Sequence, residues 1–445
     1  MSQRNPTISK GIDWSLVGIY LLLASIGIMA IFGATYKEGD PIIQSFINFR
    51  TDYSKQLYFF IVALILGLFV LITDSKFFSA TANIWYVVGI LMLLLVFPLG
   101  TDVKGTKSII RLGGFNFQPA EFCKISVSLA LAKYLSRPET DFTRTRSQLI
   151  AAAIALLPAA LTIAQKETGL ALVFFAFFLV MYREGLPSII LVVGFAMAVL
   201  VVATLLIEKD LLAMILAGIG ILVAFLMRRS IRRNKAILMA IIGITLLCVG
   251  IQRFAVPFIF KNVLAKHQVE RIYSTIGVDV PAEYLNTDSS AATDARRTNT
   301  ADYNVRQSKI AIGSGGVLGK GLMKGTQTRY GFVPEQRTDF IFDTIGEGFG
   351  FVGSFVLVAV YLLLLFRIIT VAERQRSVFS RCYAYGVAAV YFFHIGINLA
   401  MTIGLAPVIG IPLPLISYGG TSLLTFTLLL FILIRLDADR QMVLR

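Results

Sequence analysis

The stretch PEQRTDFIFDTIGEGFGFVGSFVLVAVYLLLLF, residues 334–366, changes from polar to apolar within a few positions. The run that begins at Asp339 and continues to residue 369 is long enough to cross a bilayer, which takes roughly 20 apolar residues. A carboxylate at this boundary is costly, because the hydrocarbon does not solvate charge. The stretch therefore predicts a membrane helix and raises the question of what Asp339 does there.

The rest of the chain has the same character. It is 56% hydrophobic and only 15% charged, with a mean hydropathy of +0.77, whereas soluble domains are about a quarter charged. Further apolar runs lie near 14–34, 57–73, 83–99, 119–135, 148–164, 169–183, 188–207, 211–227, 236–256, 381–403 and 416–436. We expect an all-α polytopic membrane protein of about twelve helices, folded as a single domain over residues 1–445.

The net charge of +15 is explained by membrane topology rather than by nucleic acid. Lysine and arginine gather in the short loops 137–146, 227–235 and 367–381, which lie on the same side as both termini. Both termini are therefore predicted to be cytoplasmic, and the long loop 257–338 to be extracytoplasmic. The three cysteines and two histidines show no spacing typical of disulfides or metal sites.

Acids at Asp339, Asp343 and Glu347 are spaced to share one helix face if the helix begins at the TDF sequence. Acids inside membrane helices are functional candidates by default. Helix capping is the alternative for the first two, but it does not account for Glu347, more than two turns into such a helix.

The loop IGSGGVLGKGLMKGTQ, residues 312–327, combines glycines with Lys320 and Lys324. Glycines allow the backbone to approach a ligand closely, and the lysines suit phosphate. The spacing is not that of a nucleotide-binding loop, so an ordinary flexible surface loop is the alternative.

Two further charged pairs interrupt apolar runs. Glu121 and Lys124 are three residues apart, so they can pair on one helix face, either as a structural ion pair or in a site. Lys166 and Glu167 fall at a helix break, either in an exposed turn or lining a cavity. The proline-rich, nearly uncharged segment 404–420 cannot form a regular helix and indicates irregular backbone packed inside the protein.

Together these motifs resemble the SEDS family of cell-wall polymerases, which includes RodA and FtsW. The resemblance runs from GIDW (11–14) to PLPLISYGG (412–420) and is strongest in the stretches 117–124, 307–327, 333–342 and 404–420. The sequences GIDW (11–14) and YNVRQSKIAIGSGG (303–316) are more similar to RodA than to FtsW. Family members normally have ten spans, so the resemblance makes residues 211–256 an extra helix pair.

The resemblance implies a peptidoglycan glycosyltransferase that polymerises lipid II, a lipid-linked disaccharide–peptide, at the outer face of the bacterial plasma membrane, for cell elongation. It implies as partners a class B penicillin-binding protein and membrane lipids, and no nucleic acid. Asp339 matches the essential acid of the family's TDF motif. The family's QPSE..K motif falls on Gln118, Pro119, Glu121 and Lys124, and the acid of its QPDLG motif falls on Glu167.

The chain departs from the family at several motif positions. Ser108 and Ile109 stand where an Arg-Trp pair is usual, Asp343 is an extra acid, and Gly348 replaces the second acid of a Glu-Glu pair. Because the tryptophan is missing, a non-catalytic scaffold that recruits the penicillin-binding protein is one alternative function. Because the helices are broken and carry embedded charges, a transporter or flippase for the lipid-linked precursor is the other.

In the implied reaction, Asp339 accepts the proton of the attacking sugar hydroxyl while a polyprenyl pyrophosphate leaves. The negative charge that develops on the pyrophosphate must be stabilised by cations, and the candidates are Lys124, Lys320, Lys324 and Arg271. A divalent cation such as Mg²⁺ or Mn²⁺ is the other option. Glu121, Glu167 and Glu347 complete the predicted substrate-binding set.

Overall fold

The computed structural model describes residues 11–36, 41–103, 106–112, 115–262, 269, 273 and 291–440. The chain packs as two compact units, one of Met1–Leu186 with Tyr303–Arg445 and one of Pro187–Asp302. The prediction of a single membrane domain is not tested by this division and stays a prediction.

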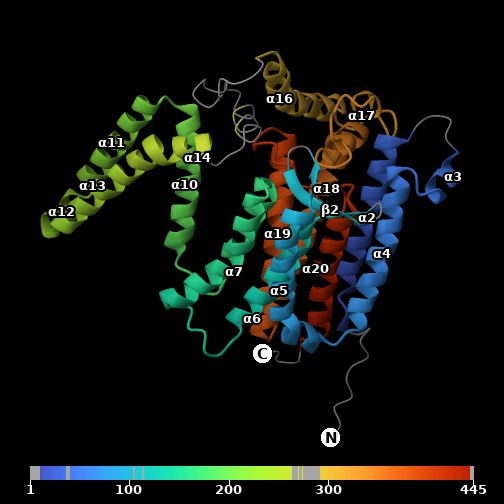
Figure 1. Ribbon diagram of the computed structural model, residues 1–445, viewed down its shortest axis with the longest axis horizontal. Coiled ribbons are helices and arrows are strands. Elements are labelled where there is room, and N and C mark those ends of the chain that lie inside the picture. Colours follow the sequence, from blue (N-terminus) through green and yellow to red (C-terminus); the bar gives the residue numbers. More distant parts are fainter. Residues whose placement is uncertain are drawn as a thin grey trace, which may run out of the picture. The chain divides into compact units, whose positions relative to one another are not determined.

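Almost all of the larger unit is helical. Its helices are α2 (Trp14–Thr35), α3 (Ile42–Ile47), α4 (Asp52–Ile72), α5 (Ser75–Leu99), α6 (Pro119–Leu135), α7 (Thr145–Ala164), α8 (Thr168–Phe174), α9 (Phe177–Arg183), α17 (Thr326–Arg329), α18 (Ile341–Glu373), α19 (Val378–Thr402) and α20 (Gly420–Ala438). The most enclosed of them is α20, which packs against α4, α6 and α19 at the centre of the bundle (Figure 1).

The smaller unit contains α10 (Ser188–Leu206), α11 (Lys209–Leu226), α12 (Arg228–Arg233), α13 (Lys235–Gly250), the π-helix η1 (Ile251–Ala255) and α14 (Val256–Asn262). The two long helices α11 and α13 lie against each other, and Gly220 faces Thr245 at their contact. Most of their apolar side chains are exposed, as expected of helices that face lipid. Helix α16 (Ala291–Ser314) runs from this unit into the larger one.

Nine helices of the described residues are long and apolar enough to cross a membrane, which confirms a mostly helical, polytopic membrane architecture. The helices α11 and α13 fall on the predicted extra pair at 211–256. The total of about twelve spans and the extent of the long loop stay predictions.

A small antiparallel sheet was not predicted. Strands β1 (Thr101–Val103), β2 (Thr106–Leu112) and β3 (Phe115–Phe117) pair in the order β1-β2-β3 between α5 and α6. Its last strand meets the start of α20, where the Thr421 hydroxyl donates to the carbonyl of Asn116 at 2.7 Å. The sheet thus anchors the first turn of the central helix.

Helix α18 is broken at Gly350, where φ is +65°. Such a break leaves peptide groups without helical partners inside the membrane domain, and these must be bonded elsewhere. The glycine loop supplies the partners: Lys320 and Gly321 donate their N–H groups to the carbonyls of Glu347 and Gly348 at 3.0 and 2.8 Å. In return, the N–H groups of Phe351 and Val352 donate to carbonyls of the same loop.

This backbone pairing accounts for the glycines of the loop. A Cβ at Gly319, where φ is +82°, would overlap the carbonyl oxygen of Gly348. A Cβ at Gly350 would in turn overlap the N–H group of Gly319. The glycines therefore serve the packing of the loop on α18.

An ion-pair network joins three helix ends at the opposite end of the larger unit. Asp13, the N-cap of α2, is 5% exposed and contacts Arg367 at 2.8 Å and Arg374 at 2.7 Å. Arg374 also pairs with the buried Asp437 of α20. Burial acts to raise the pKa of Asp13, but hydrogen bonds from Arg367, the Leu16 N–H and Arg374 outweigh it and lower that pKa.

Gly319→Ala is expected to destabilise the larger unit by about 2–3 kcal/mol, because a side chain is forced into a left-handed backbone conformation and against Gly348. Thermal unfolding in detergent measures the loss. The matched control is Gly313→Ala, at a helical position where a Cβ meets nothing within 4 Å, so that it should be neutral or slightly stabilising. Equal effects of the two substitutions would refute the packing role of Gly319.

Asp13→Asn keeps the helix cap but removes the charge that pairs with two arginines, at an expected cost of about 1–2 kcal/mol at neutral pH. A lowered folded-state pKa stabilises the fold above the unfolded value, near 3.8, and this stability is lost as the pH falls through the folded value. The difference in unfolding temperature between wild type and variant should therefore disappear on acidification. The exposed cap variant Asp74→Asn should show little difference at any pH.

Candidate functional site

Asp339 lies in the turn before α18, not in the helix, so the prediction that it shares a helix face with Glu347 is wrong. The reason is that the carbonyls of residues 337–339 are bonded elsewhere. They accept hydrogen bonds from the Tyr418 N–H at 2.8 Å, the Ser417 hydroxyl at 2.6 Å and the Asn398 amide at 2.8 Å. Three consecutive bonded carbonyls fix the backbone that presents the Asp339 carboxylate.

The partner of this turn is the irregular segment 403–419, between α19 and α20, whose irregular backbone the prolines predicted over residues 404–420. Its residues 411–417 are largely buried, and the Asn398 amide that binds Asp339 also donates to the carbonyl of Ile411 at 2.7 Å. A Cβ at Gly410 would lie 3.4 Å from the Asp339 carboxylate, an ordinary contact distance, and the φ of +74° is what favours glycine there. The segment thus packs directly against the candidate acid.

Glu167 lies next to the irregular segment 403–419 because α8, which follows it, packs against Ile409. It precedes α8, and a Cβ at Gly169 in the first turn of that helix would overlap the carbonyl oxygen of Ile409. The Glu167 carboxylate accepts a hydrogen bond from the Ser108 hydroxyl of β2 at 2.7 Å. Ser108, one of the two departures from the family's Arg-Trp pair, therefore orients a predicted site residue.

Glu121 and Lys124 form the expected ion pair on α6, at 2.7 Å, with both side chains no more than 1% exposed. The same ammonium lies 2.7 Å from Nε2 of His394, and the Nδ1 of that ring lies 3.2 Å from the carbonyl oxygen of Pro412. Lys124 is therefore enclosed by protein partners. One oxygen of Glu121 has no hydrogen-bond partner among the described residues.

Glu347 is fully buried and binds the glycine loop. Its carboxylate accepts hydrogen bonds from Lys320 at 2.8 Å, from the N–H groups of Gln327 and Thr328 at 3.0 and 2.9 Å, and from the Thr328 hydroxyl at 2.9 Å. Gly325 allows this approach, because a Cβ there would lie 2.6 Å from the carboxylate. Within this arrangement, Glu347 organises the loop.

The remaining predicted residues are placed differently. Asp343 is buried on α18 and lies 2.8 Å from the hydroxyl of Ser308, which also contacts the carbonyl of Thr402. Lys324 is exposed within the loop. Arg271 lies outside the described residues, so its predicted role is not addressed by the structure.

Within the described part of the chain, no three His, Cys, Asp or Glu side chains come together as metal ligands. The divalent cation suggested as an option has no such ligand set there.

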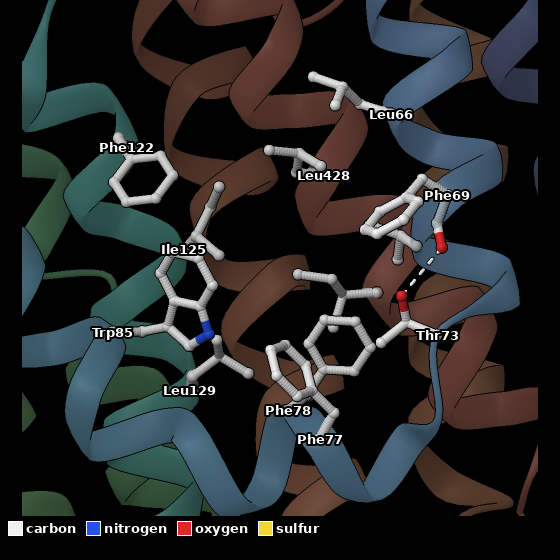
Figure 2. Close-up of a pocket in the computed structure, with 12 residues that line it drawn as sticks. Leu66, Phe69, Thr73, Phe77, Phe78, Trp85, Phe122, Ile125, Leu129 and Leu428 are labelled. Atoms are coloured by element: carbon white, nitrogen blue, oxygen red, sulfur yellow. Dashed lines mark hydrogen bonds between the residues drawn. The ribbon is translucent and has the colours of Figure 1, made fainter.

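An apolar cavity of about 180 Å³ lies on the other side of α6 (Figure 2). Phe122 and Ile125, the neighbours of Glu121 and Lys124 in the sequence, line it together with Trp85 of α5 and Leu428 of α20. Helix α6 therefore has an ionic face toward α19 and an apolar face toward this cavity. None of the predicted site residues lines the cavity.

Comparison with known proteins agrees with the fold and the motifs. The model of the FtsW/RodA/SpoVE family of cell cycle proteins matches residues 13–210 and 183–442. The chain is 30% identical to the peptidoglycan glycosyltransferase RodA of Treponema pallidum over 96% of its length and 97% of the relative's. It is also 30% identical to the peptidoglycan glycosyltransferase MrdB of Escherichia coli K12, over 82% and 80% of the two chains.

Solved structures support the same architecture. A chain of a peptidoglycan synthase complex superimposes with a TM-score of 0.63 at 22% identity, covering 96% of this chain and 98% of that one. RodA of Thermus thermophilus gives a TM-score of 0.60 at 22% identity, covering 97% and 98%. The fold and its buried acidic motifs define a polytopic membrane protein. The chain belongs to the FtsW/RodA/SpoVE family, as the resemblance indicated.

Sequence reasoning missed His394 and Asn398, which bind the segment beside Asp339. They are four residues apart in an otherwise apolar helix, HIGIN, so they share one face. Polar side chains at that spacing inside a membrane span were the available signal.

Glu347→Gln is expected to loosen the loop 314–329. The glutamine amide has one oxygen in place of two, so its NH₂ group would face a backbone N–H group, that of Gln327 or Thr328, and lose that hydrogen bond. Limited proteolysis of that loop should be about tenfold faster or more, since hydrogen bonds to a buried charge contribute on the order of 1.5–3 kcal/mol. The exposed Glu139→Gln is the control and should leave the loop protected. Unchanged cleavage in Glu347→Gln would contradict this role.

Proposed function

We propose that this protein is a peptidoglycan glycosyltransferase that polymerises lipid II, with Asp339 as the general base. The observation that carries the proposal is the fixed position of Asp339, in a turn bonded at three carbonyls and facing Gly410. A carboxylate prepared in this way before substrate binds costs little reorganisation in the transition state. The two relatives at 30% identity carry the same activity in their names.

The reaction assigns distinct tasks to the side chains. The acceptor sugar hydroxyl attacks the anomeric carbon of the donor, its proton passes to Asp339, and the bond from that carbon to the pyrophosphate breaks. Charge grows on the leaving pyrophosphate, and Lys320 and the exposed Lys324 are proposed to bind it. Arg271 remains a further candidate for this task.

The buried groups are proposed to act on the shape of the site. Glu121 and Lys124 hold α6 against α19, Glu167 begins α8 beside Ile409, and Glu347 organises the glycine loop. In the substrate complex, the half-buried Glu167 is the acceptor available for polar groups of the sugar, whereas the unpaired oxygen of Glu121 is buried and is proposed to act through the shape of the site.

Location and partner follow as parts of the same proposal. We place the chain in the bacterial plasma membrane, with both termini cytoplasmic and the Asp339 end outside. The described ends agree with a shared side, because Gly11 lies against Ala438. The partner is proposed to be a class B penicillin-binding protein, by likeness to a chain of a peptidoglycan synthase complex. The elongation role follows from the RodA-like motifs.

Asp339→Asn should abolish glycan-strand formation from purified lipid II, with a loss of about 10²–10⁴-fold, because the amide cannot take the proton. The variant is assayed beside wild type, each with a cognate transpeptidase whose own active site is blocked. Asp141→Asn, an exposed loop acid, is the control for removal of a carboxylate.

Equal polymer from wild type and Asp339→Asn would remove Asp339 from the mechanism and direct attention to Asp343 and Glu347. Failure of the wild type to make polymer while it still binds the transpeptidase would favour the scaffold, with Ile109 as the suspect. Movement of lipid II across vesicle membranes without polymerisation would favour the flippase.

A further inference from the structure

His394 occupies a buried position between the ion pair of α6 and the irregular segment. Its ring is 0% exposed and contacts Lys124 through Nε2 and the Pro412 carbonyl through Nδ1. The ring of Phe426 lies edge-on to it, with centroids 4.8 Å apart, and Lys124 lies 5.2 Å from the centroid of the same ring. Both nitrogens of the imidazole therefore have a defined neighbour.

The two partners specify one form of the ring. Lys124, 2.7 Å from the Glu121 carboxylate, is an ammonium group and offers only donors. Nε2 of His394 must therefore accept, which leaves the proton on Nδ1, where it donates to the carbonyl of Pro412. A doubly protonated ring would place two cationic donors against each other. The contacts thus require a neutral imidazole with its proton on Nδ1.

His394 and Asn398 act on consecutive peptide groups. They are four residues apart on α19, and they donate to the carbonyls of Pro412 and Ile411 respectively. Asn398 donates its second hydrogen to the carbonyl of Asp339. One face of α19 therefore holds the irregular segment at two adjacent carbonyls and joins it to the backbone of the candidate base.

We propose that His394 is a positioning residue, which holds the carbonyl of Pro412 through Nδ1–H and thereby keeps the turn at Gly410 against Asp339. Lys124 selects the ring form that can donate to this carbonyl. The effect of His394 on catalysis rests on the proposed function. The protonation form of its imidazole ring is tested without any assay of activity.

The spectroscopic test uses ¹⁵N-histidine-labelled protein in lipid bilayers and magic-angle-spinning NMR. The chain has two histidines, so His267→Gln leaves His394 as the only signal. The expected spectrum is that of a neutral imidazole protonated at Nδ1. A cationic ring or an Nε2-protonated ring would overturn the proposal, whatever the outcome for Asp339.

The kinetic test compares substitutions that preserve one contact each. His394→Phe keeps the ring but removes both nitrogens and should lower kcat about ten- to hundredfold with little change in KM, as expected for a misplaced catalytic turn. His394→Asn places an amide donor where Nδ1 was and should restore most of kcat. His394→Gln places its amide near Nε2, can still accept from Lys124, and should not restore it.

Tyr391→Phe is the matched control, because it removes another buried hydrogen bond of α19, that of the Tyr391 hydroxyl to the Phe426 carbonyl. It should lower the unfolding temperature without changing kcat. Equal loss of kcat in His394→Asn and His394→Phe, rescue by His394→Gln alone, or the same loss in Tyr391→Phe would each overturn the positioning role. Loss of activity in Asp339→Asn has no bearing on these comparisons.

Discussion

Irregular backbone inside a membrane domain must find hydrogen-bond donors within the protein, and this constraint places most of the candidate site. Residues 403–419 cannot bond to themselves as a helix, because prolines interrupt them. Their partners are therefore side chains and turns from other elements, which include Asn398, His394 and the hydroxyl of Tyr361 at Pro414. The acid that matters for the proposed chemistry belongs to one of those turns.

A second interruption obeys the same rule. The break of α18 at Gly350 frees peptide groups, and the glycine loop bonds to them on both sides. Glu347 adds a buried carboxylate that accepts from the loop's own N–H groups. Each element satisfies groups that the other leaves open, so neither has this conformation without its partner. This interdependence explains why glycines and one acid are found together without any need for a bound phosphate.

The sequence alone was sufficient for the features that depend on composition and local periodicity. Long apolar runs predicted the membrane helices, and the Glu121–Lys124 spacing predicted an ion pair. Other features depend on contacts distant in the chain. Asp339 was expected in a helix because its own neighbours permit one, and the donors that hold it outside the helix come from residues 398–418.

His394 illustrates the same limit on sequence reasoning. A lone histidine in an apolar run gives no sign of which groups face its nitrogens, and here they come from α6 and from residue 412. The sheet at 101–117 was missed because its strands are short and follow no apolar alternation that separates them from a loop. Its value to the site, the contact of Ser108 with Glu167, joins positions 59 residues apart.

The two Glu–Lys pairs differ in burial, which separates their roles. Lys124 is wholly enclosed, and removing either partner leaves an uncompensated charge in a dry interior, which is strongly destabilising. The Lys320 side chain is 29% exposed, and Glu347 keeps two backbone N–H groups and a hydroxyl if that lysine turns away. Lys320 can therefore exchange its carboxylate for an incoming anion at modest cost, whereas Lys124 cannot. The leaving pyrophosphate is thus better assigned to the loop that carries Lys320 and Lys324. Lys124 is better assigned to the buried packing that supports Asp339.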